Sequence, residues 1–447
     1  MKLIENKPST KQLIKYGIAT ILWILWMIWM KSIWMLIGLP IILDIYISKK
    51  VKWNIFKQKE GEPKKKWKEW ADALIFALVV SALIKVFIFQ LYAIPTGSLE
   101  KTMLIGDRLF VSKLSYGPRM PFTPISFPLV HNVLPFTKKT NSYLEWIKWK
   151  YKRLAGIGKI ERDDIVVFNF PVGDTIIVGY ENPDYYEWVR QYGKDRIFNE
   201  FEVKARPIDK KENFVKRCVA IPGDTLQIID SKVFINHKAQ PNYKGIQYNY
   251  IVKIKEGKIN PMTLGRMGIY TADSEYDVST NQNYMPLTDE MVEKFKQYPS
   301  LEKIEKTIVP KEQYDAHIFP HNPMFPWNYD NFGPLVIPKK GMTIDLNEGN
   351  IILYRRVIDV YDENNYEEKN GKVYIDGKEI TKYTFKQNYY WMMGDNRHNS
   401  ADSRAWGFVP ENHTVGKPVM IFYSLNEEKS FPSNIRWDRI FRIIGKE

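Results

Sequence analysis

The stretch of sequence that decides the fold is ALIFALVVSALIKVFIFQL, residues 73–91. Only Ser81, Lys85 and Gln90 interrupt its apolar run, and its length is close to the roughly 20 residues that a membrane-spanning helix needs. Directly after Tyr92 the pattern changes to short β-branched and aromatic runs separated by turn residues. The sequence therefore predicts a transmembrane helix over 73–91 that leads into a mainly β domain.

A second apolar segment, residues 16–47, precedes this helix and is interrupted mainly by Lys31 and Asp44. Two interpretations fit. One is a single tilted or kinked span, which we favour, and the other is a pair of short helices, 16–30 and 32–47, that turn at Lys31. Because no small-residue cleavage pattern follows the apolar run, we expect the segment to stay attached as a membrane anchor.

The positive charge of the chain is concentrated beside these two apolar segments. The 447 residues carry a net charge of +14, and residues 1–69 account for +9 of it. No zinc-finger, RNP or basic-zipper pattern accompanies the basic residues, so we expect no nucleic-acid partner. Nine lysines lie in the loop 49–69, which the positive-inside rule places in the cytoplasm. Everything after Tyr92 then lies on the outer side, and residues 1–15 lie outside for one span or inside for a hairpin.

The region after the membrane is rich in strand signals. They occur at 164–171, 224–229, 232–236 and 372–377. Helical periodicity is confined to 143–154, 289–297 and 437–444, of which the last predicts a short amphipathic helix in a C-terminal tail, 425–447. The only cysteine, Cys218, excludes a disulfide framework. We therefore expect an all-β domain outside the membrane.

Three stretches concentrate side chains that can carry chemistry. In YAIPTGSLEKTM (92–103), Ser98 follows a glycine that permits an exposed turn, but a serine hydroxyl needs a base before it becomes a nucleophile. In NFVKRCVAIPGD (213–224), Lys216 lies in an apolar strand pattern, where burial would lower its pKa and let a neutral amine accept the serine proton. The third stretch, MMGDNRHNSADSRAWGFVP (392–410), is a loop whose side chains bond to one another.

Together with RDDIVVF at 162–168, these stretches resemble the bacterial type I signal peptidases, membrane-bound Ser/Lys proteases that remove signal peptides from secreted preproteins. The four motifs occur in the order of the family and behind its membrane anchor. The resemblance implies an inner (cytoplasmic) membrane enzyme whose catalytic β-domain, 92–235 and 387–424, lies on the extracytoplasmic side. Its partners would be preprotein signal peptides and the lipid bilayer. Residues 236–386 contain none of the motifs, so we expect them to form a separately folded, β-rich accessory insertion.

Carried over by position, the resemblance also implies a role for each site residue. Ser98 would attack the scissile carbonyl, and Lys216 would act as general base and later protonate the leaving amine. Thr96 and the backbone N–H of Ser98 would hold the oxyanion. Further along the chain, Ser400 would orient the lysine, and Asp402 and Arg404 would form an ion pair that supports the site. The reaction needs no metal and no cofactor. Three positions depart from the family pattern, Leu99, Lys101 and His398.

Other functions remain open at the level of sequence. Ser98 and Lys101 fit the S-x-x-K motif of β-lactamases and penicillin-binding proteins, but the Lys-Ser/Thr-Gly motif is absent and no helix is predicted to begin at Ser98. A membrane-anchored binding module would leave the pairing of Ser98 with Lys216 unexplained. Asp315, His317 and His321 lie close enough in sequence to ligate zinc, but neighbouring prolines favour a loop.

Overall fold

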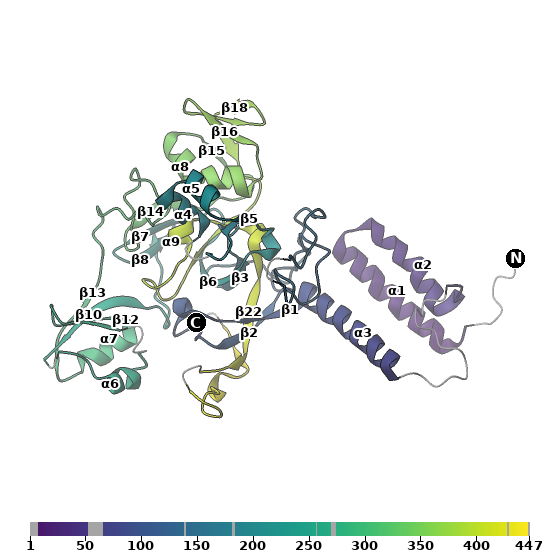
Figure 1. Ribbon diagram of the computed structural model, residues 1–447, viewed down its shortest axis with the longest axis horizontal. Coiled ribbons are helices and arrows are strands. Elements are labelled where there is room, and N and C mark those ends of the chain that lie inside the picture. The colour runs from purple at the N-terminus through teal and green to yellow at the C-terminus, as the bar shows by residue number, and fades with distance from the viewer. Residues whose placement is uncertain are drawn as a thin grey trace.

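The computed structural model describes residues 8–51, 66–137, 140–180, 184–255, 257–269, 274–426 and 429–445. Most of the basic loop predicted at 49–69 lies outside these residues. Figure 1 shows a group of helices at the N-terminal end and a larger, mainly β part beside it. The predicted fold class, apolar N-terminal helices followed by a mainly β region, is confirmed.

Two helices, α1 (Thr10–Met30) and α3 (Lys66–Phe87), are long and apolar enough to cross a membrane. The 21 residues of α1 extend over about 32 Å, which is comparable with the roughly 30 Å hydrocarbon core of a bilayer. The helix in the segment predicted at 73–91 ends earlier than expected, at Phe87, because the chain then enters strand β1 (Phe89–Ala93). Helix α3 is therefore joined to the β part almost without a linker.

A single span over 16–47, the interpretation that we favoured, is wrong. Lys31 adopts a left-handed conformation, φ 45°, which ends α1 and reverses the chain into α2 (Gly38–Leu43). The returning segment packs closely on α1, since a Cβ atom at Gly38 would lie 2.1 Å from the ring of Trp23. The indole N–H of Trp23 also donates to the carbonyl oxygen of Met35 at 2.8 Å. The segment is therefore a helical hairpin that turns at Lys31.

The end of α1 lies beside the end of α3. The rings of Trp26 and Trp29 contact Phe87 with centroid separations of 5.6 and 6.3 Å, and the Trp29 indole donates to the carbonyl oxygen of Ala155 at 3.0 Å. Both helices therefore approach the β part with their C-terminal ends (Figure 1). This arrangement places the beginning of α1 on the same side as the beginning of α3.

The β part is built on an eight-stranded sheet in the order β1-β2-β22-β3-β6-β20-β21, with β23 paired to β22. The further strands are β2 (Asp107–Ser112), β22 (Thr414–Ser424), β3 (Ile165–Asn169), β6 (Asn213–Ala220), β20 (Tyr389–Met393), β21 (Val409–Pro410) and β23 (Arg442–Ile443). Every residue of β3 is buried, because alternate side chains enter apolar clusters on opposite faces. Central strands β3 and β6 thus form a rigid platform for the side chains that they carry.

The predicted accessory insertion, 236–386, is not one separately folded unit. Its strand β14 (Phe332–Val336) pairs with β7 (Thr225–Ile229), which continues through β8 (Lys232–Ile235) to β9 (Lys238–Ala239). Trp327 and Phe332 of the insertion pack in one apolar cluster with Trp391 of the catalytic sheet. Residues 307–386 are therefore part of the shared core, and the boundary that we expected at 386 is not a domain boundary.

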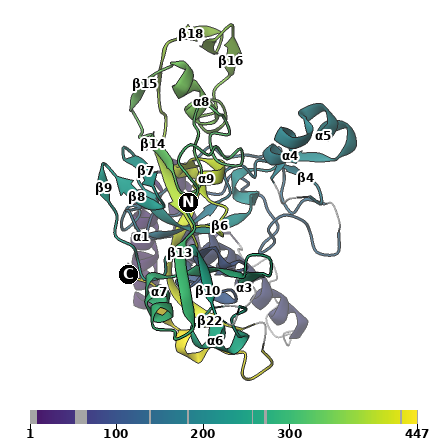
Figure 2. The same cartoon turned by 90° about the vertical axis from the view of Figure 1, so that its left-hand side faces the viewer.

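Only the first half of the insertion forms a lobe with a core of its own. Its sheet has the order β11-β12-β10-β13, made of Glu275–Asp277, Gln282–Leu287, Tyr248–Ile254 and Leu301–Lys306. The helices α6 (Pro261–Arg266) and α7 (Asp289–Lys296) belong to the same lobe, and Phe295 of α7 is fully buried in its cluster. Figure 2 shows this lobe and the part that carries α8 (Glu348–Arg356) at opposite ends of the molecule.

Smaller elements complete the β part. The strands are β15 (Thr343–Asp345) with β19 (Lys382–Thr384), the three-stranded β16 (Tyr366–Lys369), β17 (Lys372–Ile375) and β18 (Lys378–Ile380), and β4 (Thr175–Ile177) with β5 (Val203–Ala205). The helices are α4 (Tyr185–Tyr192), α5 (Lys194–Glu200) and α9 (Ser403–Trp406). The part of the chain after α3 is therefore mainly β, and it is not the all-β domain that the sequence predicts.

The helices predicted at 143–154 and 437–444 do not form, because the backbone of each segment pairs with another part of the chain. Residues 143–154 are irregular because their backbone pairs with an earlier segment, as in the bonds from Trp149 N–H to the Phe122 carbonyl and from Leu144 N–H to the Ile125 carbonyl. The tail contains only a 3₁₀ turn and β23, which is held by pairing with β22. In contrast, the helix predicted at 289–297 is α7.

Candidate active site

Ser98 is presented on a short 3₁₀ turn, Gly97–Leu99, that follows β1. The next side chain, Leu99, is 1 % exposed and anchors the turn in the apolar cluster below the sheet. On the other side, the backbone N–H of Asn396 donates to the carbonyl oxygen of Ser98 at 3.0 Å. Both contacts hold the backbone at Ser98 in place.

Lys216 reaches the same point from strand β6. Its Nζ lies 2.5 Å from the Oγ of Ser98, and its side chain is 3 % exposed. The strands β1 and β6 are four positions apart in the sheet, which corresponds to about 19 Å in a flat sheet. The contact therefore depends on the strong curl of the sheet and on the turn that carries Ser98 back over β6.

The surroundings of Lys216 favour its neutral form. Burial lowers the pKa of Lys216 to about 8, although Asp402 and Asp395 oppose this shift and Arg404 adds to it. A neutral amine at hydrogen-bond distance from a hydroxyl can accept the hydroxyl proton. The pair can therefore activate Ser98 near neutral pH.

A cavity of about 200 Å³ opens beside the two side chains. Its lining is largely apolar and includes Ile94, Leu109, Val167 and Phe214. Thr96 also lines the cavity and is exposed there, so its hydroxyl can reach a group bound next to Ser98. The cavity provides room for a substrate with small apolar side chains.

The loop after β20 brings Ser400 close to the same point. Its Oγ has no hydrogen-bond partner among the described residues, so the expected bond to Lys216 is not formed. A Cβ atom at Gly394 would lie 2.2 Å from this Oγ and 2.7 Å from the Ser98 carbonyl oxygen. Only glycine at position 394 allows the two serines to approach this closely.

Asp402 and Arg404 form a buried ion pair behind the site. Two hydrogen bonds of 3.0 and 2.8 Å join the guanidinium to the carboxylate, which also accepts the N–H of Gly394 at 3.0 Å. Burial opposes ionisation of Asp402, but Arg404 and the hydrogen bonds outweigh it and hold the pKa of Asp402 below its usual range. The pair fixes the glycine against which Ser400 lies.

The sequence matches the family model described as "Signal peptidase, peptidase S26" over residues 67–316 and 335–423. The chain belongs to the S26 signal peptidase family. It is therefore a hydrolase of the serine protease class.

Three relatives named Signal peptidase I are similar to this S26 chain over most of its length. One from Buchnera aphidicola subsp. Acyrthosiphon pisum is 25% identical over 366 residues, which are 80% of this chain and 76% of the relative. One from Haemophilus influenzae is 25% identical over 387 residues, 86% of this chain and 77% of the relative. One from Helicobacter pylori (strain 26695) is 24% identical over 387 residues, 84% and 92% respectively.

Sequence reasoning missed a second buried ion pair in this S26 site. Arg217, next to Lys216, binds Asp395 through hydrogen bonds of 2.8 and 2.7 Å, and their side chains are 2% and 0% exposed. Asp395 also accepts the hydroxyl of Thr102 at 2.7 Å. The pair thus joins the strand of the lysine to the segment after Ser98. Its residues lay within the quoted motifs, but no sequence pattern indicated that they would meet.

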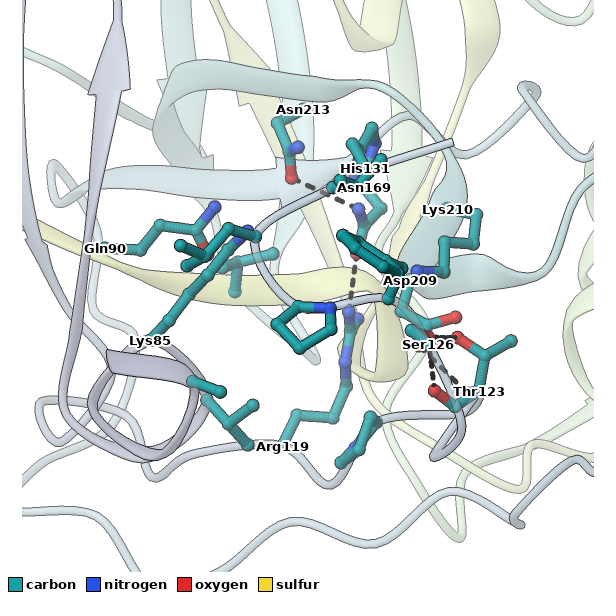
Figure 3. A pocket seen from close by; sticks show the side chains of 18 of the residues that line it. Lys85, Gln90, Arg119, Thr123, Ser126, His131, Asn169, Asp209, Lys210 and Asn213 are labelled. Atoms are coloured by element: carbon teal, nitrogen blue, oxygen red, sulfur yellow. Dashed lines mark hydrogen bonds between the residues drawn. The ribbon is translucent and has the colours of Figure 1, made fainter. Parts of the chain in front are cut away.

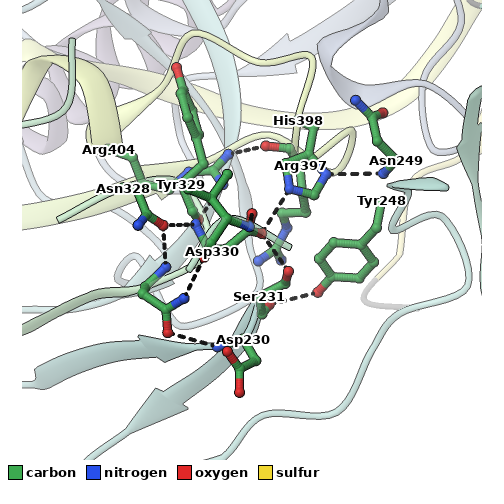
Figure 4. A network of polar contacts seen from close by, with 12 residues as sticks. Asp230, Ser231, Tyr248, Asn249, Asn328, Tyr329, Asp330, Arg397, His398 and Arg404 are labelled. Carbon is green, nitrogen blue, oxygen red and sulfur yellow. Dashed lines mark hydrogen bonds and ion pairs between the residues drawn. The ribbon is translucent and has the colours of Figure 1, made fainter. Parts of the chain in front are cut away.

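His398, one of the three residues that differ from the family pattern, connects the loop that carries Ser400 to the insertion. His398 Nε2 lies 2.8 Å from a carboxylate oxygen of Asp330, and its Nδ1 accepts the backbone N–H of Asn249 at 3.0 Å. Asp330 also accepts the hydroxyl of Ser231. Figure 4 shows these residues as one network that reaches Arg404. Residues of both halves of the insertion therefore support the loop that carries Ser400.

The alternative sites gain no support from the geometry. Lys101 Nζ donates to the carbonyl oxygen of Gly268 at 2.8 Å and pairs with Glu100 at 3.1 Å, so it is directed to the lobe. His317 lies in a turn and pairs with Glu187 at 3.4 Å. Within the described ranges, no group of three or more His, Cys, Asp or Glu side chains could hold a metal ion.

Proposed function

We propose that this chain is a membrane-bound serine endopeptidase that cleaves N-terminal signal peptides from secreted preproteins. The observation that carries this proposal is the distance of 2.5 Å between Lys216 Nζ and Ser98 Oγ beside an apolar cavity. The curated relatives named Signal peptidase I support the substrate class. The test is cleavage of a model preprotein by the wild-type chain, which the variant Ser98→Ala should not perform.

The proposed reaction uses only side chains that surround the cavity. Neutral Lys216 accepts the proton of Ser98 as Oγ attacks the scissile carbonyl carbon. The negative oxygen that forms is stabilised by the Ser98 N–H and the Thr96 hydroxyl, an interaction worth roughly 3–4 kcal/mol per donor in other hydrolases. Protonated Lys216 then donates to the leaving amine. A water molecule then gives a proton to Lys216 and attacks the acyl ester, and Lys216 returns this proton to the departing Oγ of Ser98.

The position of the site next to the membrane supports a substrate that is itself held in the bilayer. Strand β1 begins two residues after α3 ends, and Ser98 lies five residues beyond the end of β1. Small side chains precede the cleavage site of a signal peptide, and such side chains fit a shallow apolar cavity. Ser400 is positioned to orient the Lys216 amine through its free hydroxyl once substrate binds.

The pKa of Lys216 gives an expected pH profile. Because a base must be neutral, kcat/KM should rise with pH and level off above about 8, whereas an ordinary lysine with a pKa near 10.4 would still be titrating. The measurement is kcat/KM for a signal-peptide substrate from about pH 6 to about pH 10. Burial also lowers the pKa of Lys306, in strand β13 of the lobe, to about 8. Lys306→Gln is therefore the control, and its pH profile should match that of the wild type. An inflection near 10 would contradict the role of Lys216.

We further propose that the loop 49–69 is cytoplasmic and that the β part lies outside. With α1 and α3 running in the same direction, the start of α1 is then also cytoplasmic. Cysteines introduced by Lys65→Cys and Ser9→Cys should resist a membrane-impermeant thiol reagent in intact cells, whereas exposed Lys244→Cys should react. The natural cysteine, Cys218, is fully buried and should not react with the reagent. Labelling of the cysteine at position 65 in intact cells would show that the loop lies outside, and it would contradict the proposed orientation.

A further inference from the structure

A second cavity, of about 250 Å³, lies where α3 meets the β part. The last turns of α3 contribute Ala82 and Val86, strand β1 contributes Gln90, and the segment 121–131 closes another side. Figure 3 shows Lys85 reaching in from α3, with Lys210 across the cavity from it. Because α3 ends at Phe87, a bilayer crossed by α3 would have its headgroups at the level of this cavity.

The cavity carries a marked excess of positive charge. Four basic side chains line it, against the single carboxylate of Asp209: Lys85, Lys113, Arg119 and Lys210. Within the described part of the chain, none of the four forms an ion pair. Arg119 donates only to neutral acceptors, the carbonyl of Asn412 and the side-chain oxygen of Asn169. Asp209 is already engaged by the N–H and hydroxyl of Thr123 at 2.9 Å each.

These cations repel one another in a place that is poorly solvated. Burial, together with the charges of Arg119, Lys85 and Arg153, lowers the pKa of Lys113 to about 7. The pKa of Arg119 is likewise lowered to about 10 by burial and by the charge of Arg153. Buried charge without a counter-charge is unfavourable, and a bound anion would reduce the repulsion and supply the negatively charged partner that the four side chains lack among the described residues.

The segment beside the cations is apolar and exposed. Phe127, Leu129 and Val130 line the cavity, and Phe127 and Leu129 are more than half exposed. Apolar side chains of α3 adjoin them on the membrane side. A ligand that suits this surface has an anionic group for the cavity and apolar chains for the segment and helix.

We propose that this cavity binds the phosphodiester of an anionic phospholipid, whose acyl chains lie along α3 and the segment 125–130. Basic pockets at the ends of membrane helices bind phospholipid headgroups in this way. Inorganic phosphate shares the anionic chemistry but not the apolar chains. The site is separate from the proposed Ser98 and Lys216 reaction, although Tyr92 and Asn213 line both cavities.

The test counts lipids bound to the full chain. The protein is purified in mild detergent and titrated with phosphatidylglycerol or phosphatidylcholine, and native mass spectrometry gives the apparent Kd of each. The wild type should retain one phosphatidylglycerol in preference to phosphatidylcholine. Lys85→Gln/Lys113→Gln should weaken this binding about 25-fold, because each lysine near an anionic headgroup contributes roughly fivefold. Lys210→Gln, on the opposite side of the cavity, should weaken it about fivefold.

The matched control is Lys148→Gln/Lys159→Gln, which removes the same charge from exposed lysines outside the cavity. It should bind phosphatidylglycerol like the wild type, and thermal unfolding checks that all variants are folded. An equal loss in the control would mean general surface attraction and would overturn the proposal. Equal retention of phosphatidylglycerol and phosphatidylcholine by the wild type would also overturn the proposal. Displacement of phosphatidylglycerol by an equal concentration of inorganic phosphate would show a free-anion site instead of a lipid site.

Discussion

Replacing Lys216 by methionine should reduce preprotein cleavage by on the order of 10²–10⁴-fold, the range that general acid–base catalysis contributes. Methionine fills the buried, largely apolar surroundings of the side chain but supplies no base. Ser98→Ala should cause a loss at least as large, and the double variant should be no worse than the single ones, because the two groups act as a unit. The measurement is kcat/KM for a model preprotein with the full chain in detergent or vesicles.

Two further variants test whether Lys216 or Lys101 is the general base. Lys101→Met is the matched control, because Lys101 lies three residues from Ser98 but is bonded to Gly268 and Glu100, and its activity loss should be small. Lys216→Arg keeps the charge and should fail nearly as badly as Lys216→Met, since arginine stays protonated and offers no base. An active Lys216→Met beside an inactive Lys101→Met would refute the proposed pair. Reaction of Ser98 with an acylating probe gives an independent readout.

The second large effect is on stability. Asp395→Ala should lower the free energy of unfolding by about 3–5 kcal/mol, because it leaves the guanidinium of Arg217 buried without its partner. Cleavage should fall as well, since Thr102, four residues after Ser98, loses its hydrogen-bond acceptor. The measurement is thermal or urea unfolding in detergent, with the same preprotein assay on the folded fraction.

The controls for this prediction use other ion pairs and the double variant. Asp395→Ala/Arg217→Met removes both charges and should recover much of the lost stability, because the uncompensated charge is gone. Glu290→Ala breaks the exposed pair with Lys294 and should change stability little. If Asp395→Ala were as mild as Glu290→Ala, the buried pair would not be what holds the two segments together.

Local pattern was sufficient for several parts of the molecule. An apolar run as long as a bilayer is thick predicts the helix α3, and short β-branched and aromatic runs between turn residues predict β3, β7, β8 and β17. Ser98, Lys216 and Ser400 were singled out because their motifs resemble those of a family, and the structure brings all three to one place. Such features depend on neighbouring residues or on a fixed order of motifs, which a sequence displays directly.

What only the tertiary structure decided depends on residues far apart in the chain. The reversal at Lys31 is stabilised by packing of Gly38 on Trp23. Residues 143–154 have a helical sequence pattern but form no helix, because their backbone pairs with 122–125. The second half of the insertion belongs to the shared core because β14 pairs with β7.

The same holds for the two sites. The curl of the sheet closes the distance between Ser98 and Lys216, Arg217 meets Asp395 across 178 residues, and four cations gather beside α3. The sequence by itself determined which segments are apolar enough to span a membrane, where β3, β7, β8 and β17 lie, and which side chains carry reactive groups. Their contacts were decided by long-range packing, whose free energy outweighs the small local propensities of the segments involved.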